Sequence, residues 1–196
     1  MDIDDFWVFL ERSARETDDQ LQRTRWLEER LCRVARKHIV DFQIHVDTLR
    51  RPLDTYAMWG AASLMLEGWC SGDSFWYFQP WLIGQGRRWY EHAALSPDNL
   101  ADLPAVRALA GRRRREWDKA EWPGWETLAY VARRAHDYLT GQEDSIVAEL
   151  RTRGHRSLSD PAPADRAWNF RDPAELRRRL PRLTGLFPPE RFLNFA

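Results

Sequence analysis

The stretch from Asp54 to Leu100 constrains the fold more than any other, because it holds five of the eleven tryptophans in less than a quarter of the chain. These five are Trp59, Trp69, Trp76, Trp81 and Trp89. The apolar residues in it recur at helical spacing, beginning with Met58, Ala62, Met65, Leu66 and Trp69. No run of alternating β-branched residues competes with this pattern anywhere in the chain. The sequence therefore predicts an all-α fold organised around this stretch.

Two helices and a capped turn account for the first part of the stretch. The spacing predicts a helix from Thr55 to Glu67, which Gly68 ends because glycine tolerates a left-handed backbone. Ser71 or Asp73 is then placed to accept hydrogen bonds from the free amides that open the next helix.

The second predicted helix is apolar around much of its circumference, which is typical of a central helix packed on several sides. Its main stripe consists of Phe75, Phe78, Leu82, Trp89 and Ala93. Pro80 removes a backbone donor, so we expect a kink there and an exposed or otherwise satisfied carbonyl at Trp76. Gly84 and Gly86 are costly inside a helix, and they predict close approach of a neighbouring helix or a ligand. We therefore expect one Trp-rich core helix at the centre of a single-domain multi-helix bundle.

A family resemblance is carried by the runs WGAASLM and CSGDSFWYFQPWLIGQGRRWYEHAALSPDNLADLP. They resemble the bacterial DUF4240 family, and ETLAYVARRAHDYLTG and FRDPAELRRRLPRL resemble its later segments. The chain departs from the family pattern at Trp69, Gly72 and Pro80, where a glycine, an acidic residue and a non-proline are usual. The resemblance implies a helical domain over residues 1–183, followed by a Phe/Pro-rich tail over residues 184–196, and it implies no reaction.

The bulk composition limits the classes of function. The 30 basic residues equal the 30 acidic residues in number, so no overall charge draws the chain to nucleic acid or to an anionic membrane. The acidic opening MDIDDFW is not a secretory signal, and no apolar run reaches the length of a transmembrane helix. Two cysteines, Cys32 and Cys70, do not form a disulfide framework. These features predict a cytoplasmic protein with no membrane association.

Helical patterns also flank the central stretch. Between Asp18 and Arg50 the spacing fits either one long helix or two helices that break near Lys37, with Thr17 or Asp18 as the cap. A further helix is predicted from Asp102 through Trp117, with the arginines at 112–115 on its solvated side. Residues 152–165 read as a surface loop. In the tail, Phe187, Phe192 and Phe195 must be buried on the domain or on a partner.

His38, Asp41 and His45 lie on one face of the predicted helix before Arg50, which suggests a metal site. The two histidines are seven positions apart, or roughly 10 Å along a helix, and do not easily share one ion. Solvated or partly buried polar side chains are the favoured interpretation, and we predict neither a metal nor a cofactor.

Recognised catalytic motifs are absent from the sequence, including phosphate-binding loops, metal-spaced cysteine and histidine sets, and nucleophile elbows. A pocket, if present, is expected beside the central turn. The candidate binding residues are Trp59, Trp69, Asp73, Gln85, Arg87 and Glu126. Each also has a purely structural interpretation: Asp73 as a helix cap, Arg87 as a partner of a carboxylate, Glu126 as a first-turn acid and the tryptophans as core.

Two functions of different class remain open from the sequence. The first is a non-enzymatic interaction or accessory protein that binds a protein or peptide through an aromatic surface near the central turn or the tail. The alternative is an enzyme or small-molecule-binding domain with a pocket around Asp73, Arg87 and Glu126. Nucleic-acid binding through the arginine cluster is disfavoured, because Glu116 and Asp118 dilute its charge.

Overall fold

The computed structural model describes residues 1–158 and 160–194, and every regular element in these ranges is a helix. The α-helices are α1 (Ile3–Glu16), α2 (Gln20–Leu31), α3 (Arg36–Arg50), α4 (Tyr56–Met65), α5 (Gly72–Ile83), α6 (Arg87–Leu95), α7 (Pro104–Leu109), α8 (Val131–Thr140), α9 (Ser145–Thr152), α10 (Pro173–Arg179) and α11 (Pro181–Leu186). Short 3-10 helices are η1 (Arg51–Leu53), η2 (Pro97–Asp102), η3 (Arg114–Glu116), η4 (Lys119–Glu121), η5 (Glu126–Tyr130) and η6 (Pro189–Asn194). The all-α prediction is confirmed. Among the described residues, no helix has the length and apolar character needed to cross a membrane.

The turn between α4 and α5 has the capped form that the sequence predicts. The Thr55 hydroxyl accepts the Met58 amide at 3.0 Å and so caps α4, and Gly68 after the helix has a left-handed φ of 85°. At α5 the cap is Ser71, whose hydroxyl accepts the Ser74 amide at 3.2 Å. Of the two predicted caps, the structure uses the serine.

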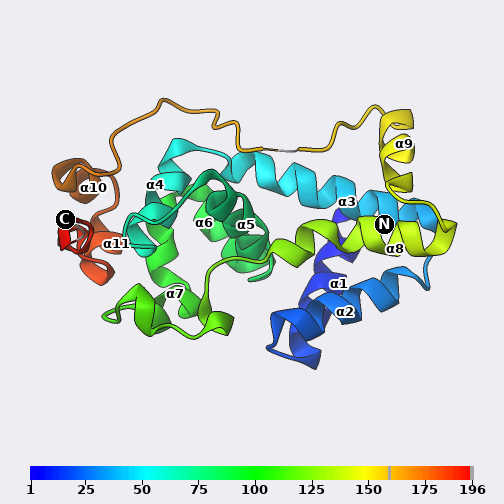
Figure 1. The fold of residues 1–196 in the computed structure, drawn as a ribbon, viewed down its shortest axis with the longest axis horizontal. Coiled ribbons are helices and arrows are strands. Elements are labelled where there is room, and N and C mark those ends of the chain that lie inside the picture. Colours follow the sequence, from blue (N-terminus) through cyan, green and yellow to red (C-terminus); the bar gives the residue numbers. More distant parts are fainter. Residues whose placement is uncertain (159, 195–196) are drawn as a thin grey trace.

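One end of the molecule consists of α1, α2, α3, α8 and α9, with α8 packed against α2 and α3 (Figure 1). Of the two predicted arrangements for residues 18–50, the two-helix one is confirmed, because α2 ends at Leu31 and α3 begins at Arg36. The predicted cap of α2 was wrong by one position: the carboxylate of Asp19 accepts the Gln22 amide at 2.7 Å.

The predicted single core helix is wrong, because the chain breaks between α5 and α6. Gly86 has φ of 92°, a conformation that ends α5 and starts a new helix in another direction. A Cβ on Gly84 would lie 2.5 Å from ring carbons of Trp125, so the predicted close approach is made by a tryptophan side chain. Phe75 and Trp89 consequently belong to two helices and not to one stripe.

Pro80 lies inside α5, and the carbonyl that it leaves without a helical donor is satisfied as predicted. Nη2 of Arg50 on α3 donates to the Trp76 carbonyl oxygen at 2.8 Å. Arg50 thereby ties α3 to α5 at the centre of the fold.

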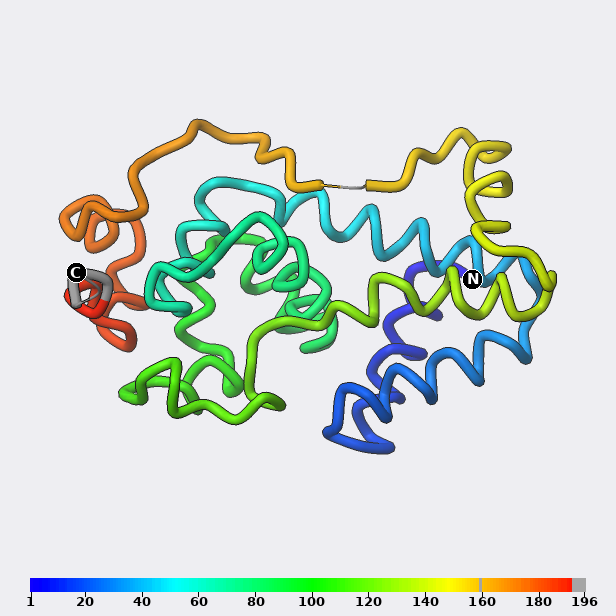
Figure 2. The backbone as a smooth tube through the Cα atoms, viewed as in Figure 1, coloured from blue at the N-terminus to red at the C-terminus, as the bar shows by residue number. Residues whose placement is uncertain are grey.

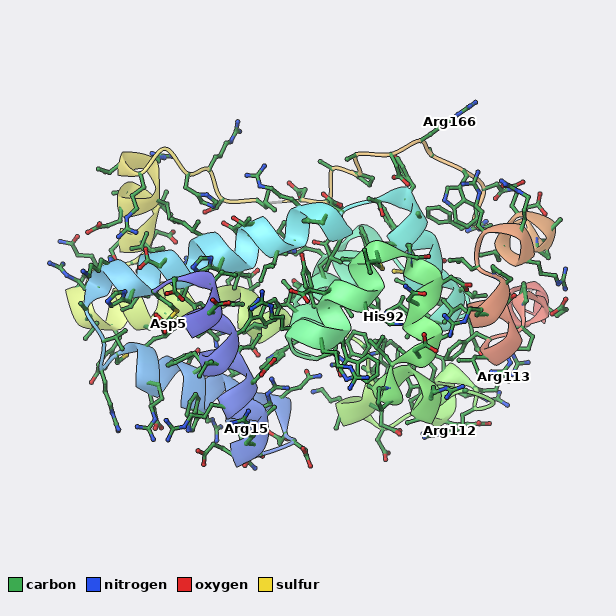
Figure 3. All side chains as sticks on the ribbon, turned by 180° about the vertical axis from the view of Figure 1, so that it is seen from behind. Asp5, Arg15, His92, Arg112, Arg113 and Arg166 are labelled. Atoms are coloured by element: carbon green, nitrogen blue, oxygen red, sulfur yellow. The ribbon has the colours of Figure 1, made fainter. Side chains whose placement is uncertain are left out.

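The predicted helix from Asp102 to Trp117 is also wrong. Residues 97–102 form η2, α7 ends at Leu109, and Gly111 has φ of 79°. The arginines that follow fold into a turn because their side chains find partners there. Arg112 forms a two-pronged ion pair with Glu121 (Nη1–Oε1 2.5 Å, Nη2–Oε2 2.8 Å), and Arg113 lies 3.5 Å from the buried Glu67 (Figure 3).

After α9 follows a long segment whose described residues form no helix. We call residues 153–158 and 160–172 the strap. Figure 2 shows the described parts of the strap running from the α9 end past α3 to α10 at the opposite end. There α10 and α11 pack against α4 and η2. The predicted loop over residues 152–165 begins one residue too early, because Thr152 still belongs to α9, a helix that was not predicted.

The tail predicted from residue 184 begins inside α11, which spans Pro181–Leu186. Phe187 is only 1% exposed, so this part of the tail packs on the domain itself. Phe195 and the side chain of Phe192 lie outside the described part of the chain.

Candidate functional site

The six predicted site residues do not form a single pocket. Arg87 begins α6, where it lies 2.6 Å from Asp4 and 2.7 Å from Glu91, and the two carboxylates raise its pKa. The cavity that Arg87 lines contains neither Asp73 nor Glu126. Asp73 lies in the first turn of α5, and the rest of α5 after it, about 15 Å of helix, separates it from α6.

Glu126 lies exposed in the first turn of η5, beside Tyr77 of α5. The pKa of Tyr77 is raised to about 12, mainly by burial of the phenol and then by hydrogen bonding to Glu126 and its charge. Tyr77, the neighbour of Glu126, follows Asp73 by four residues in α5. Glu126 therefore lies about one helical turn along α5 from Asp73.

The two predicted tryptophans of the central turn differ in their surroundings. Trp59 is half-buried, donates from Nε1 to the Cys70 carbonyl oxygen at 3.0 Å, and stacks on Phe75 with ring centres 4.9 Å apart. Trp69 is 55% exposed, and the guanidinium of Arg114 lies 5.2 Å from its ring centre. Trp59 therefore packs with the core, and Trp69 contributes to the surface beside the arginine turn.

A groove lies on the exposed side of α6, with a volume of about 750 Å³. Its wall consists of Glu11, Arg87, Arg88, Trp89, Glu91, His92, Leu95 and Asp102. The apolar contribution comes from Trp89, which is half-buried, and from Leu95, which is 82% exposed. Arg88 lies over the Trp89 ring at 4.9 Å and has no carboxylate within ion-pair distance among residues 1–158 and 160–194.

The groove follows from the amphipathic pattern of α6. Tyr90 and Ala93 are the residues that α6 buries, and the Tyr90 hydroxyl donates to the Leu49 carbonyl oxygen of α3 at 2.9 Å. Glu91 and His92, which lie between them in the helical turn, and Trp89 just before them therefore lie on the side of the groove. Burial of one stripe fixes the orientation of the groove wall.

One end of the groove is held by His92 (Figure 3), which contacts Asp102 of η2. His92 Nε2 lies 2.8 Å from Asp102 Oδ2, and Asp102 also accepts a hydrogen bond from Arg182 of α11. These two partners lower the pKa of Asp102. A histidine with a carboxylate can move protons, and the described residues of the wall include no serine, cysteine or lysine beside this pair.

Gln85, another predicted residue, lies at a separate cavity between α5 and the turn that joins α1 to α2. The buried Arg23 lines the same cavity. Sequence reasoning missed Arg23, because it occurs in a stretch of many exposed charges, where nothing marks one arginine as buried.

Sequence reasoning also missed a buried polar network around Arg50, which is 2% exposed. Its guanidinium carbon lies 3.2 Å from the centre of the Trp76 ring, and its Nε donates to Gln79 Oε1 at 3.1 Å. Gln79 in turn donates to Asp54 Oδ1 at 3.3 Å. Burial lowers the pKa of Arg50 to about 10, and the nearby charge of Asp47 opposes this shift.

The strap closes this network from outside. Asp54 Oδ2 accepts the Ala162 amide at 2.7 Å, and His155 Nε2 lies 2.8 Å from Asp47 Oδ2. Burial raises the pKa of Asp47, an effect that its hydrogen bonds oppose. Each residue of the network thus has a partner within the chain, which assigns the network to structure. Farther along the strap, Arg166 points away from the molecule (Figure 3).

His38, Asp41 and His45 have other partners than a metal ion. Asp41 lies 2.5 Å from the amino group of Met1, 2.5 Å from Arg153 and 3.1 Å from His38 Nδ1, while His45 Nε2 lies 3.1 Å from the Met1 carbonyl oxygen. Within the described ranges, no group of three or more His, Cys, Asp or Glu side chains is arranged to hold a metal.

The fold and groove define an all-α domain with a buried polar centre and an open aromatic groove on its surface. The chain belongs to the DUF4240 family, described as a protein of unknown function, whose sequence profile matches residues 1–138. This match ends in α8, so the resemblance of residues 170–183 to the family stays a prediction. No curated protein and no solved structure matches the chain.

Proposed function

We propose that this chain is a non-enzymatic bacterial accessory protein of the cytoplasm that binds a partner protein through the α6 groove. The occupant is a short peptide segment with an aliphatic or aromatic side chain close to an acidic one. The observation that carries the proposal is the pairing, on one exposed wall, of Leu95 and Trp89 with Arg88, which lacks a carboxylate within the described part of the chain.

The apolar part of the wall favours a hydrophobic anchor on the partner. Leu95 at 82% exposure and the accessible part of Trp89 would both lose contact with water on binding. Tryptophan and arginine are the residue types that most often dominate binding energy at protein interfaces. The groove therefore has the composition of an interaction site.

The charges of the wall favour an acidic residue beside that anchor. Arg87 is already paired with Asp4 and Glu91, but Arg88 has no carboxylate partner in the described part of the chain and is held over Trp89. A carboxylate of the partner can therefore pair with Arg88 without displacing an internal partner.

The groove is also held rigid on several sides, which lowers the entropic cost of binding. Glu11 of α1 accepts the Arg87 amide at 3.0 Å, and the contacts of His92 and Tyr90 hold the other sides. The central turn, where the sequence places the aromatic surface, contributes Trp69 on another element. Its role in binding stays a prediction.

A peptide-display selection on the intact protein tests the proposal. We expect enrichment of peptides that pair an aliphatic or aromatic residue with Asp or Glu. Binding should be lost in the double variant Arg88→Glu/Leu95→Asp. The matched control is Leu21→Asp/Arg25→Glu, which places the same two changes on exposed positions of α2, and it should bind like the unmodified protein. Peptides that bind both double variants equally would show that the groove is not the site.

A further inference from the structure

A second cavity, distinct from the α6 groove, lies where the turn between α1 and α2 faces the C-terminal end of α5 and α7. It has a volume of about 360 Å³. The residues that decide its chemistry are Asp18, Arg23, Trp81, Gln85, Leu109 and Glu121. A cavity of this size lies within the range of small-molecule sites.

Arg23 is the buried cation of this cavity, with an exposed fraction of 7%. Its Nε donates to the Ser13 hydroxyl at 3.1 Å, its Nη2 donates to the Gly84 carbonyl oxygen at 3.0 Å, and its guanidinium carbon lies 4.4 Å from the centre of the Trp125 ring. These contacts fix the guanidinium in one position. They are all to neutral groups and leave its positive charge uncompensated.

The third nitrogen of the guanidinium, Nη1, forms no hydrogen bond within residues 1–158 and 160–194. In these ranges two side-chain atoms are fully enclosed and lack a partner, namely Trp117 Nε1 and His136 Nε2. Nη1 of Arg23 is not one of them, so it is not fully enclosed. Since Arg23 lines the cavity, the accessible remainder of its guanidinium opens into that space. A buried cation without an ion pair is costly, and burial lowers its pKa to about 10.

The two carboxylates at the cavity differ in whether their negative charge is paired within the chain. Glu121 accepts both Nη atoms of Arg112 and the Asp118 amide, which together lower its pKa to about 2, so its charge is neutralised within the chain. Asp18 is exposed and forms no ion pair with Arg23 in the structure, although it is the nearest charge that raises the pKa of Arg23. The floor of the cavity is thus cationic, and Asp18 adds a negative charge to its lining.

We propose that this cavity binds a small organic monocarboxylate, with Nη1 of Arg23 and the side-chain amide of Gln85 as donors to the carboxylate. Gln85 Nε2 uses one hydrogen on the Trp81 carbonyl oxygen at 3.2 Å and has a second one available. The apolar end of the ligand lies against Trp81 and Leu109. A dicarboxylate is disfavoured, because its second negative charge would approach Asp18.

Isothermal titration of the intact protein tests this proposal with three probes of similar size: 4-methylpentanoate, its neutral amide and the dianion 3-methylglutarate. We expect 4-methylpentanoate to bind more tightly than both others. Arg23→Gln should weaken it at least about tenfold, because a hydrogen bond to a charged group is lost. Arg25→Gln, an exposed neighbour on α2, should leave the affinity unchanged.

Two further variants keep the test decisive if Arg23→Gln fails to fold. Gln85→Leu should weaken 4-methylpentanoate binding, and Asp18→Asn should reduce the preference for it over 3-methylglutarate. Equal binding of the acid and its amide, or no heat of binding in a titration to about 10 mM, would overturn the proposal. The test does not depend on the α6 groove, so either proposal can fail without the other.

Discussion

The helices α5 and α6 are neighbours in the sequence and contrast in their environments. Among its twelve residues α5 buries Phe75, Trp76, Phe78, Gln79, Pro80, Trp81, Leu82 and Ile83, whereas α6 buries Tyr90 and Ala93. The change occurs over the three residues from Gly84 to Gly86, where the backbone reverses into a positive φ. A tryptophan-rich sequence therefore does not determine whether a tryptophan belongs to the core or to the surface. The break between the helices decides it.

The polar groups of the two regions differ in the same way. Those around α5, centred on Arg50, have partners inside the chain and are shielded by the strap. The polar groups on α6 form ion pairs beside an exposed groove, and Arg88 has no carboxylate partner among the described residues. We expect substitutions near α5 to change stability and substitutions on the α6 wall to change binding.

The largest effect on stability is expected from Arg50→Met. It removes the buried cation whose charge lies near Asp47 and Asp54, and it removes the donor to the Trp76 carbonyl oxygen. Loss of one member of such a buried group typically costs about 3–5 kcal/mol. Urea unfolding should show it, with Arg51→Met, at an exposed neighbour, as control. A shift as small as that of the control would mean that the network does not hold α3 to α5.

A smaller loss is expected from Gly84→Ala. The new methyl group would overlap the Trp125 ring, which lies 2.5 Å from the Cβ position, and overpacking of this kind costs about 1–3 kcal/mol. Gly72→Ala, at the first residue of α5, is the matched change, since a Cβ there meets no atom within 4 Å. Thermal unfolding of both variants should separate them, and equal melting temperatures would contradict the described packing.

Stability should change with pH in opposite directions for a buried carboxylate and for a carboxylate that is paired at the surface. Burial raises the pKa of Asp47 in the folded state, so the folded state binds its proton more readily than the unfolded chain. Its contribution to stability is therefore present below the unfolded pKa of 3.8 and is lost as the pH rises through the raised folded value. As the pH rises through this range, Asp47→Asn should become more stable relative to the unmodified protein, as measured by urea unfolding at several pH values. A constant difference would contradict the assignment.

At the protein surface, Glu121 should give the reverse slope. Its folded pKa of about 2 lies below the ordinary value of 4.5, so its stabilising contribution is present above pH 4.5 and is lost as the pH falls towards 2. Glu121→Gln should therefore differ from the unmodified protein at neutral pH and converge with it in acid. The same titrations measure this convergence, and a difference that grows in acid would refute the ion pair with Arg112.

The smallest effect on stability is expected from Arg88→Glu/Leu95→Asp on the α6 wall. Both side chains are exposed, and exposed substitutions usually change the free energy of unfolding by no more than about 0.5 kcal/mol. Urea unfolding should give this result for the same variant that loses peptide binding. A loss of several kcal/mol would show that the wall is part of the structural centre.

Local signals in the sequence predicted the parts of the fold that depend on neighbouring residues. Thr55, Ser71 and Gly68 mark the ends of α4 and α5, and Pro80 predicted a carbonyl in need of a donor at Trp76. Each of these signals acts between residues that lie within a few positions of each other in the chain. Family membership was also predicted, and it is confirmed over residues 1–138.

These local signals do not predict contacts between segments that are distant in the sequence. The donor to Trp76 comes from Arg50, 26 residues away, and the ring that packs on Gly84 belongs to Trp125. No spacing rule distinguishes Arg23 or Arg50 from the exposed arginines around them. Of the predicted site residues, the structure places Arg87 on the groove and Gln85 on the second cavity, while Asp73 and Glu126 lie elsewhere.

Hydrogen–deuterium exchange of the protein with a peptide selected on it tests the division between the two helices most directly. Our account predicts slower exchange in α6, over residues 87–95, and unchanged exchange in α5 and in the central turn at residues 66–71. Slower exchange around Trp69 with no change in α6 would contradict it, and would place the binding surface at the turn.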